Sequence, residues 1–193
     1  MAETPSTQTL APGDRAPDFS LPDGEGDVYA LDSIKGEYAT VVIFACNHCP
    51  YVIHLAEGIA NISHEYEEKG VGFAAISAND VENYPQDGPV EMVAFADASH
   101  WEFPYLYDES QDVAKAYHAA CTPDFFVFDG DLNLTYAGQF DASRPKNGGE
   151  VTGADIRAAL DATIAGESVP TPVVPSTGCN IKWKPGGEPS YFG

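Results

Sequence analysis

The sequence predicts an α/β fold in which a central mixed β-sheet is flanked by helices. Apolar, β-branched segments alternate along the chain with segments of helical periodicity, an order typical of parallel strands joined by helical crossovers. Two strand-like segments separated by Asp129-Gly-Asp predict one antiparallel hairpin. The length of 193 residues and the hydrophobic content of 44% are ordinary for one domain with a full core.

The first half of the chain is expected to form two strands of the sheet and a long helix between them. An edge strand precedes them within residues 16–23, where short apolar alternation is bounded by prolines. Residues 40–45 are β-branched and too few for a helix, so we expect a strand buried on both faces. The next helix ends near Gly70 and is followed by a strand over residues 71–77. Its apolar face consists of Val52, Leu55, Ile59, Ile62 and Tyr66.

The second half is expected to contain three further helices and the hairpin. In order, the expected elements are a helix over 90–98, a helix over 111–119, strands over 125–128 and 134–140, and a helix over 156–164 closed by Gly166. We divide the chain into a flexible N-terminal segment over 1–14, one α/β domain over 15–168, and a Pro- and Gly-rich tail over 169–193 that packs on the domain.

The charge of the chain limits its partners and its location. Nine Lys and Arg against thirty Asp and Glu give a net charge of −21, so nucleic acid, which is bound mainly through basic side chains, is not an expected partner. Such acidity indicates a salt-loving organism, where concentrated salt screens the self-repulsion; an acidic mesophilic protein is the alternative. The chain has no apolar run of about 20 residues and no leader pattern. We therefore expect no membrane association and a cytoplasmic location.

A dithiol motif, Cys46-Asn-His-Cys49, lies between the buried strand and the first long helix. A helix N-terminus lowers the pKa of a thiol because it stabilises the thiolate, and the thiolate is the form that attacks a disulfide or a peroxide. Four cysteines in a chain without a secretory leader favour catalysis or metal binding over structural disulfides. The motif therefore predicts thiol redox chemistry.

The motifs together resemble the redoxin group of thioredoxin-fold proteins. They are Ala16-Pro-Asp-Phe-Ser-Leu, Cys46-Asn-His-Cys49 and Thr122-Pro123. More narrowly, Cys-Asn-His-Cys-Pro-Tyr, Ala-Cys-Thr-Pro-Asp-Phe-Phe and Gly-Cys-Asn-Ile-Lys-Trp-Lys-Pro-Gly resemble a peroxiredoxin-like subfamily related to alkyl hydroperoxide reductase and thiol-specific antioxidant proteins. The resemblance implies a thioredoxin-like domain with an N-terminal β extension. It also implies that Pro123 is a cis-proline facing the dithiol and that the backbone of Thr122 is offered to an extended substrate segment.

The resemblance implies a thiol-disulfide oxidoreductase without a bound organic cofactor. Cys46 attacks the target disulfide as a thiolate and Cys49 resolves the mixed disulfide. Asn47 and Pro50 would contribute to substrate binding. His48 either stabilises the thiolate as an imidazolium or points into solvent. The expected partners are protein or small-molecule disulfides, or peroxides if the protein is a peroxidase, and a thioredoxin-like protein or a low-molecular-weight thiol as reductant.

Two departures from the family patterns keep alternatives open. Thioredoxins have a buried Asp six residues before the first Cys, where this chain has Thr40, so another acid such as Asp18 or Glu37 would have to replace it. The Cys49-Pro50 pair resembles the peroxidatic cysteine of peroxiredoxins and makes Cys49 or Cys46 an alternative peroxidatic thiol. The hydroxyl that peroxiredoxins carry three residues before that cysteine is missing for both, so peroxide reduction is the second reading.

Cys121 and Cys179 are auxiliary thiols in this prediction. Cys121 lies two residues before Pro123, and Cys179 lies in a tail long enough to fold back, so all four thiols could converge as a relay or a second disulfide. Both could equally be inert, since free Cys is often simply buried. A four-cysteine zinc site is disfavoured because it usually needs two closely spaced pairs, so no metal is expected. A non-catalytic binding module is disfavoured because it needs neither thiol.

Overall fold

The computed structural model describes residues 3–7 and 9–192, and a five-stranded mixed sheet lies at its centre. In spatial order its strands are β6 (Tyr105–Tyr107), β5 (Val71–Ser77), β4 (Ala39–Phe44), β8 (Asp124–Asp129) and β9 (Leu134–Gly138). The three strands β4, β5 and β6 are parallel, whereas β8 is antiparallel to both β4 and β9. The predicted mixed sheet and its hairpin are therefore confirmed.

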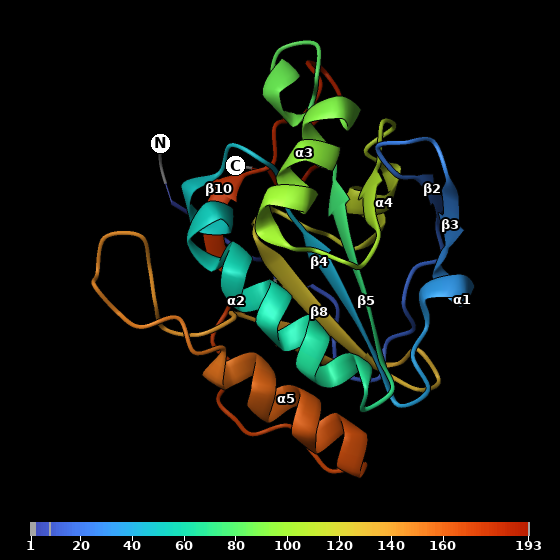
Figure 1. The fold of residues 1–193 in the computed structure, drawn as a ribbon, viewed down its shortest axis with the longest axis vertical. Coiled ribbons are helices and arrows are strands. Elements are labelled where there is room, and N and C mark those ends of the chain that lie inside the picture. Colours follow the sequence, from blue (N-terminus) through green and yellow to red (C-terminus); the bar gives the residue numbers. More distant parts are fainter. Residues whose placement is uncertain (1–2, 8, 193) are drawn as a thin grey trace.

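Helices cover both faces of the sheet, as Figure 1 shows. One face packs against α2 (Pro50–Glu67), α3 (Pro89–Ser99) and α5 (Ala154–Ala165), and the other against α1 (Leu31–Ile34) and α4 (Asp112–Ala116). Every residue of β4 is buried, because Val41 and Ile43 face the first layer while Val42 and Phe44 face the second. The dithiol follows directly from this doubly covered strand.

The long helix α2 begins where its sequence predicts. Cys49 is its N-cap, with an extended backbone (φ −71°, ψ 120°), and Pro50 is its first residue. A proline is well placed there because the N–H that it lacks would have no partner within the helix. The chain leaves the helix through Gly70, whose positive φ of 76° suits a residue without a Cβ.

Two small sheets lie outside the central one. In the first, β10 (Thr177–Asn180) pairs antiparallel with both β1 (Thr4–Pro5) and β7 (Cys121–Thr122). The second pairs β2 (Ser20–Pro22) with β3 (Val28–Ala30). Figure 1 shows β10 beside the N-terminal end of α2. The tail thus returns to the point where the dithiol lies.

The structure differs from the sequence prediction in several elements. The helix expected over 111–119 is only α4, because Gln111 and His118 adopt left-handed backbone angles (φ 66° and 52°) at its two ends. The short elements β1, β3, α1, β6, β7 and β10 are additional, since each has only two to four residues and carries no long periodic pattern. A 3-10 turn, η1 (Pro85–Asp87), lies in the loop before α3.

The ends of the chain bear on the predicted domain division. Part of the segment 1–14 forms β1, so residues 4 and 5 are paired, while residues 1, 2 and 8 lie outside the described part of the chain. The tail packs on the body through Ile181 and Trp183, which are buried in the core around α4. The domain limits and the flexibility of the first segment stay predictions. Within the described residues, α2 and the other helices are too short or too polar to traverse a lipid bilayer.

Candidate active site

The two cysteines of the motif lie at the junction of β4 and α2. Cys46 follows the strand by two residues, and Cys49 caps the helix. Both side chains are buried, at 1% and 0% exposure. A helix N-terminus favours negative charge, so the fold places the dithiol where a thiolate is stabilised.

The peptide bond between Thr122 and Pro123 is cis, as the resemblance implies. Both motif thiols contact Thr122: Cys49 Sγ donates to the carbonyl oxygen of Thr122 (3.1 Å), and Cys46 Sγ lies 3.4 Å from its Oγ1. The cis-proline segment is therefore directly opposite the dithiol.

The backbone of Thr122, however, already has a strand partner. Cys179 of β10 is directly opposite Thr122 in the antiparallel pair, and Asn180 is opposite Cys121. The tail of the chain thus occupies the edge that the resemblance offers to a substrate. This pairing also explains why neither thiol of the motif is exposed.

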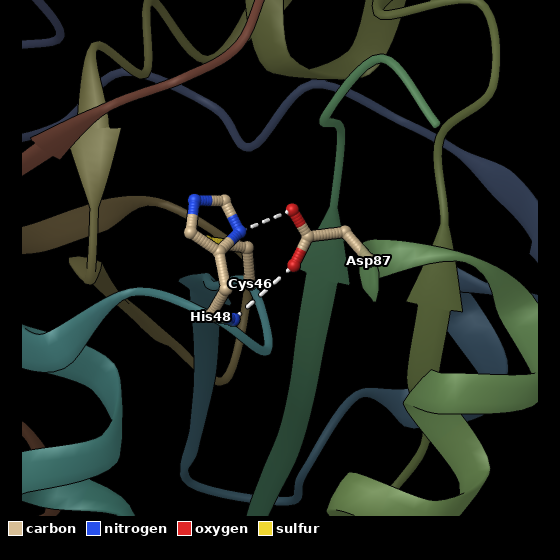
Figure 2. Close-up of side chains that lie close together, drawn as sticks. All are labelled: Cys46, His48 and Asp87. Atoms are coloured by element: carbon tan, nitrogen blue, oxygen red, sulfur yellow. Dashed lines mark hydrogen bonds and ion pairs between the residues drawn. The ribbon is translucent and has the colours of Figure 1, made fainter. Parts of the chain in front are cut away.

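His48 pairs with a buried carboxylate rather than pointing freely into solvent. Its Nδ1 lies 2.6 Å from Asp87 Oδ2, and its backbone N–H donates to Asp87 Oδ1 (3.2 Å), as Figure 2 shows. The ring also stacks on Tyr84, with 5.8 Å between centroids. Figure 2 shows Cys46 immediately behind this pair. The imidazole is thereby held beside the first cysteine.

Asp87 organises the loop between the two cysteines. It is fully buried and also accepts hydrogen bonds from the backbone N–H of Asn47 (2.9 Å) and from Asn79 Nδ2 (2.9 Å). The side chain of Asn47 accepts from Tyr105 Oη (2.9 Å) and donates to Gln86 O (2.9 Å). In this structure Asn47 therefore positions the loop.

The acid beside the dithiol is not one of those expected from the sequence. Asp18 and Glu37 are exposed, and Thr40 uses its hydroxyl to accept from the backbone N–H of Gly36 (3.1 Å). The buried acid beside the dithiol loop is Asp87. No sequence signal identifies it, because it comes from η1, 39 residues after His48.

The hydrogen bonds distribute charge unequally between the two thiols. Donation from Cys179 and from Cys46 lowers the pKa of the Cys49 thiol, although burial opposes this. The pKa of Cys46 is raised by its hydrogen bond with Cys49, by burial and by the negative charge of Asp87. These interactions favour the thiolate form of Cys49 over that of Cys46, whereas the sequence alone favours Cys46 as the thiolate.

Three of the four cysteines meet in the site. Cys179 is 2% exposed and shares the core cluster of Cys46 and Cys49. Cys121 is next to Thr122 and so faces the opposite side of the strand, where its thiol contacts the carbonyl oxygen of Pro123 (3.7 Å). The fold therefore does not bring all four thiols together, either as a relay or as four zinc ligands.

A metal ion would use a different set of side chains. One ligand atom each from Cys46, His48 and Asp87 lies within 4.8 Å of the other two. In this protein the carboxylate of that set already bonds the imidazole and two N–H groups.

The strand order and the cis-proline opposite the dithiol define a thioredoxin-like fold, and the comparisons agree. Residues 12–137 match the AhpC/TSA family model. A crystal structure of an uncharacterized conserved protein from Geobacillus kaustophilus has 50% identity and a TM-score of 0.92, covering 96% of this chain and 98% of that one. The thioredoxin domain of a thiol-disulfide oxidoreductase from Bacteroides vulgatus has a TM-score of 0.59 at 17% identity, covering 77% of this chain and 97% of that one.

Among curated proteins, Peroxiredoxin Bcp of Escherichia coli K12 is 29% identical over 129 residues, which are 66% of this chain and 78% of that protein. The family match spans well over half of the sequence. The chain therefore belongs to the AhpC/TSA family and is an oxidoreductase of the thioredoxin-like fold.

Proposed function

We propose that the protein is a thiol-disulfide oxidoreductase that works through Cys46 and Cys49. The observation that carries this is the contact of both thiols with Thr122, directly before the cis-proline, at the N-terminus of α2. Two thiols held together in this way can pass two electrons to a disulfide without any other group.

In the proposed reaction Cys46 attacks first. Its proton passes to the adjacent pair of His48 and Asp87, and its sulfur bonds to one sulfur of the target while the other leaves as a thiolate. Cys49, whose thiolate form is favoured by its lowered pKa, then attacks the Cys46 sulfur and releases the second target thiolate. The target disulfide is reduced by two electrons, and the Cys46–Cys49 pair is oxidised to a disulfide.

Peroxide reduction is the second candidate, favoured by the family match and by the similarity to Peroxiredoxin Bcp. Against it, the residues three positions before Cys46 and Cys49 are Ile43 and Cys46, which carry no hydroxyl. The hydroxyl nearest to a motif thiol in the described contacts is that of Thr122. A peroxidase would have to use it in place of the missing one.

Stopped-flow oxidation of the reduced protein separates the two reactions. The wild type is mixed with a small disulfide or with hydrogen peroxide, beside Cys46→Ser, Cys49→Ser and, as a matched control, Cys121→Ser. The proposal expects fast reaction with the disulfide, a trapped mixed disulfide on Cys46 in Cys49→Ser, and unchanged rates in Cys121→Ser. Fast consumption of peroxide with a slow disulfide reaction would instead identify a thiol peroxidase.

The proposal extends to partners and location. A thioredoxin-like protein or a small thiol would reduce the Cys46–Cys49 disulfide back to two thiols. This reaction suits a reducing compartment such as the cytoplasm, where cysteines stay reduced. No organic cofactor is required for these exchanges. The comparisons give no support to a high-salt origin, which stays a prediction from the net charge of −21.

A further inference from the structure

We propose that Cys179 is a third redox thiol of this site. It replaces Cys46 as the partner of Cys49 in the disulfide. The inference rests on the proposed dithiol function and adds to it an internal exchange partner on the C-terminal strand β10.

The position of Cys179 follows from strand register. It lies opposite Thr122, the residue that both motif thiols contact, and so it faces the dithiol. Its side chain is buried in the same core cluster as those of Cys46 and Cys49, and its interaction with Cys49 lowers the pKa of the Cys49 thiol. A substrate cysteine in an extended segment paired with Thr122 would occupy an equivalent place. The tail thus presents its own cysteine to the site as a substrate would.

The close approach of β10 depends on the residue before Cys179. A Cβ on Gly178 would collide with the carbonyl oxygen of Thr122, at a separation that real Cβ atoms do not show. On its other side β10 is held by β1, where Gly178 is opposite Thr4. Cys179 is therefore fixed between two strands and directed at Cys49.

The exchange balances without an external oxidant or reductant. After the target has been reduced, the site holds a Cys46–Cys49 disulfide. Cys179, as a thiolate, attacks the Cys49 sulfur; a Cys49–Cys179 bond forms, the Cys46–Cys49 bond breaks, and Cys46 leaves as a thiolate that takes up the proton lost by Cys179. The number of disulfides is unchanged. Cys46 is returned to its thiol form beside His48 and Asp87, while β10 becomes covalently tied to α2.

The test uses oxidised glutathione as the probe and Cys46→Ser as the background. Glutathione disulfide reacts with Cys49 to give a mixed disulfide, and Cys179 then displaces glutathione, so the product is a Cys49–Cys179 disulfide without an adduct. Adding Cys179→Ser should leave the glutathione on Cys49, whereas adding Cys121→Ser should change nothing. The products are alkylated in acid and mapped by mass spectrometry of the unreduced peptides.

Wild-type protein is treated in parallel, so that a failure of the role of Cys179 can be distinguished from a failure of the proposed disulfide reduction through Cys46. Cys46→Ser protein that keeps its glutathione adduct, or that leaves both thiols free, overturns the role of Cys179 even if the wild type forms the Cys46–Cys49 disulfide. A Cys49–Cys179 disulfide in Cys46→Ser supports that role, also where the wild type fails to reduce disulfides through Cys46. Equal linkage of Cys49 to Cys121 would contradict the register argument.

Discussion

Asp124 offers the sharpest test of the electrostatics around the cis-proline. It directly follows Pro123, is fully buried and accepts a hydrogen bond from Ser6 Oγ (3.1 Å). Burial raises its pKa from 3.8 to about 7, although hydrogen bonds from Ser6 and Ser176 oppose the shift. Asp124→Asn keeps the shape of the side chain and removes the titration.

The sign of the effect follows from proton binding. Between the unfolded pKa of 3.8 and the folded pKa of about 7, the native state holds a proton that the unfolded chain has lost. The free energy of unfolding therefore falls as the pH rises through this range and levels off above it. Starting from pH 5, the free energy of unfolding falls over roughly two pH units until the folded pKa is reached, a loss of about 3 kcal/mol. The asparagine variant should lack this loss.

The measurement is urea unfolding in the presence of a reductant, at pH values from about 5 to about 8. The free energy of unfolding of Asp124→Asn, minus that of the wild type, should increase by about 3 kcal/mol across the range. Asp32→Asn, which neutralises an exposed carboxylate, controls for the loss of one charge from a chain of net charge −21. A difference that does not vary with pH would refute the reasoning, because Asp124 would then titrate alike in the folded and unfolded states.

The other predictions concern the thiol, the strand β10 and the tail. The pKa of Cys46 is raised by its hydrogen bond with Cys49, by burial and by the negative charges of Asp87 and Cys49, and the variant Asp87→Asn removes only the charge of Asp87. The pKa of Cys46, followed by the pH dependence of its alkylation, should fall, and an unchanged value would exclude Asp87 as a cause. Gly178→Ala should cost about 2 kcal/mol in urea unfolding, since the added Cβ meets the carbonyl of Thr122; wild-type stability would contradict the close contact of β10 with β7. Trp183→Ala should cost about 3 kcal/mol, because it empties part of the core around α4, and a negligible loss would mean that the tail packs only weakly.

Local sequence signals predicted the part of the site that lies on regular elements. The buried run of β4, the helix face of α2 and the pair Thr122-Pro123 are each recognisable within a few residues. The position of the dithiol follows from them, because a strand and a helix joined by so short a loop leave it few alternatives.

The remaining part of the site depends on tertiary packing. Asp87 reaches His48 from a 3-10 turn in a loop, and nothing in the surrounding Tyr-Pro-Gln-Asp segment distinguishes it from an exposed acid. Cys179 reaches Cys49 because a short strand in the tail pairs with β7, and four residues containing a glycine give no periodicity. Long-range contacts of this kind leave no local sequence pattern. The sequence could therefore suggest that the tail lies near the dithiol, but not that Cys179 lies beside Cys49.

The β1–β10–β7 sheet has a consequence for the order in which the protein acquires its properties. Its three strands come from residues 4–5, 121–122 and 177–180, so the layer that buries the dithiol is complete only when the last of these has been synthesised. Chains emerge from the ribosome N-terminus first, and domains fold as units. A nascent chain that has formed β4 and α2 therefore presents Cys46 and Cys49 uncovered. The newly made protein passes through a period in which its cysteines are open to chemistry that the finished molecule restricts.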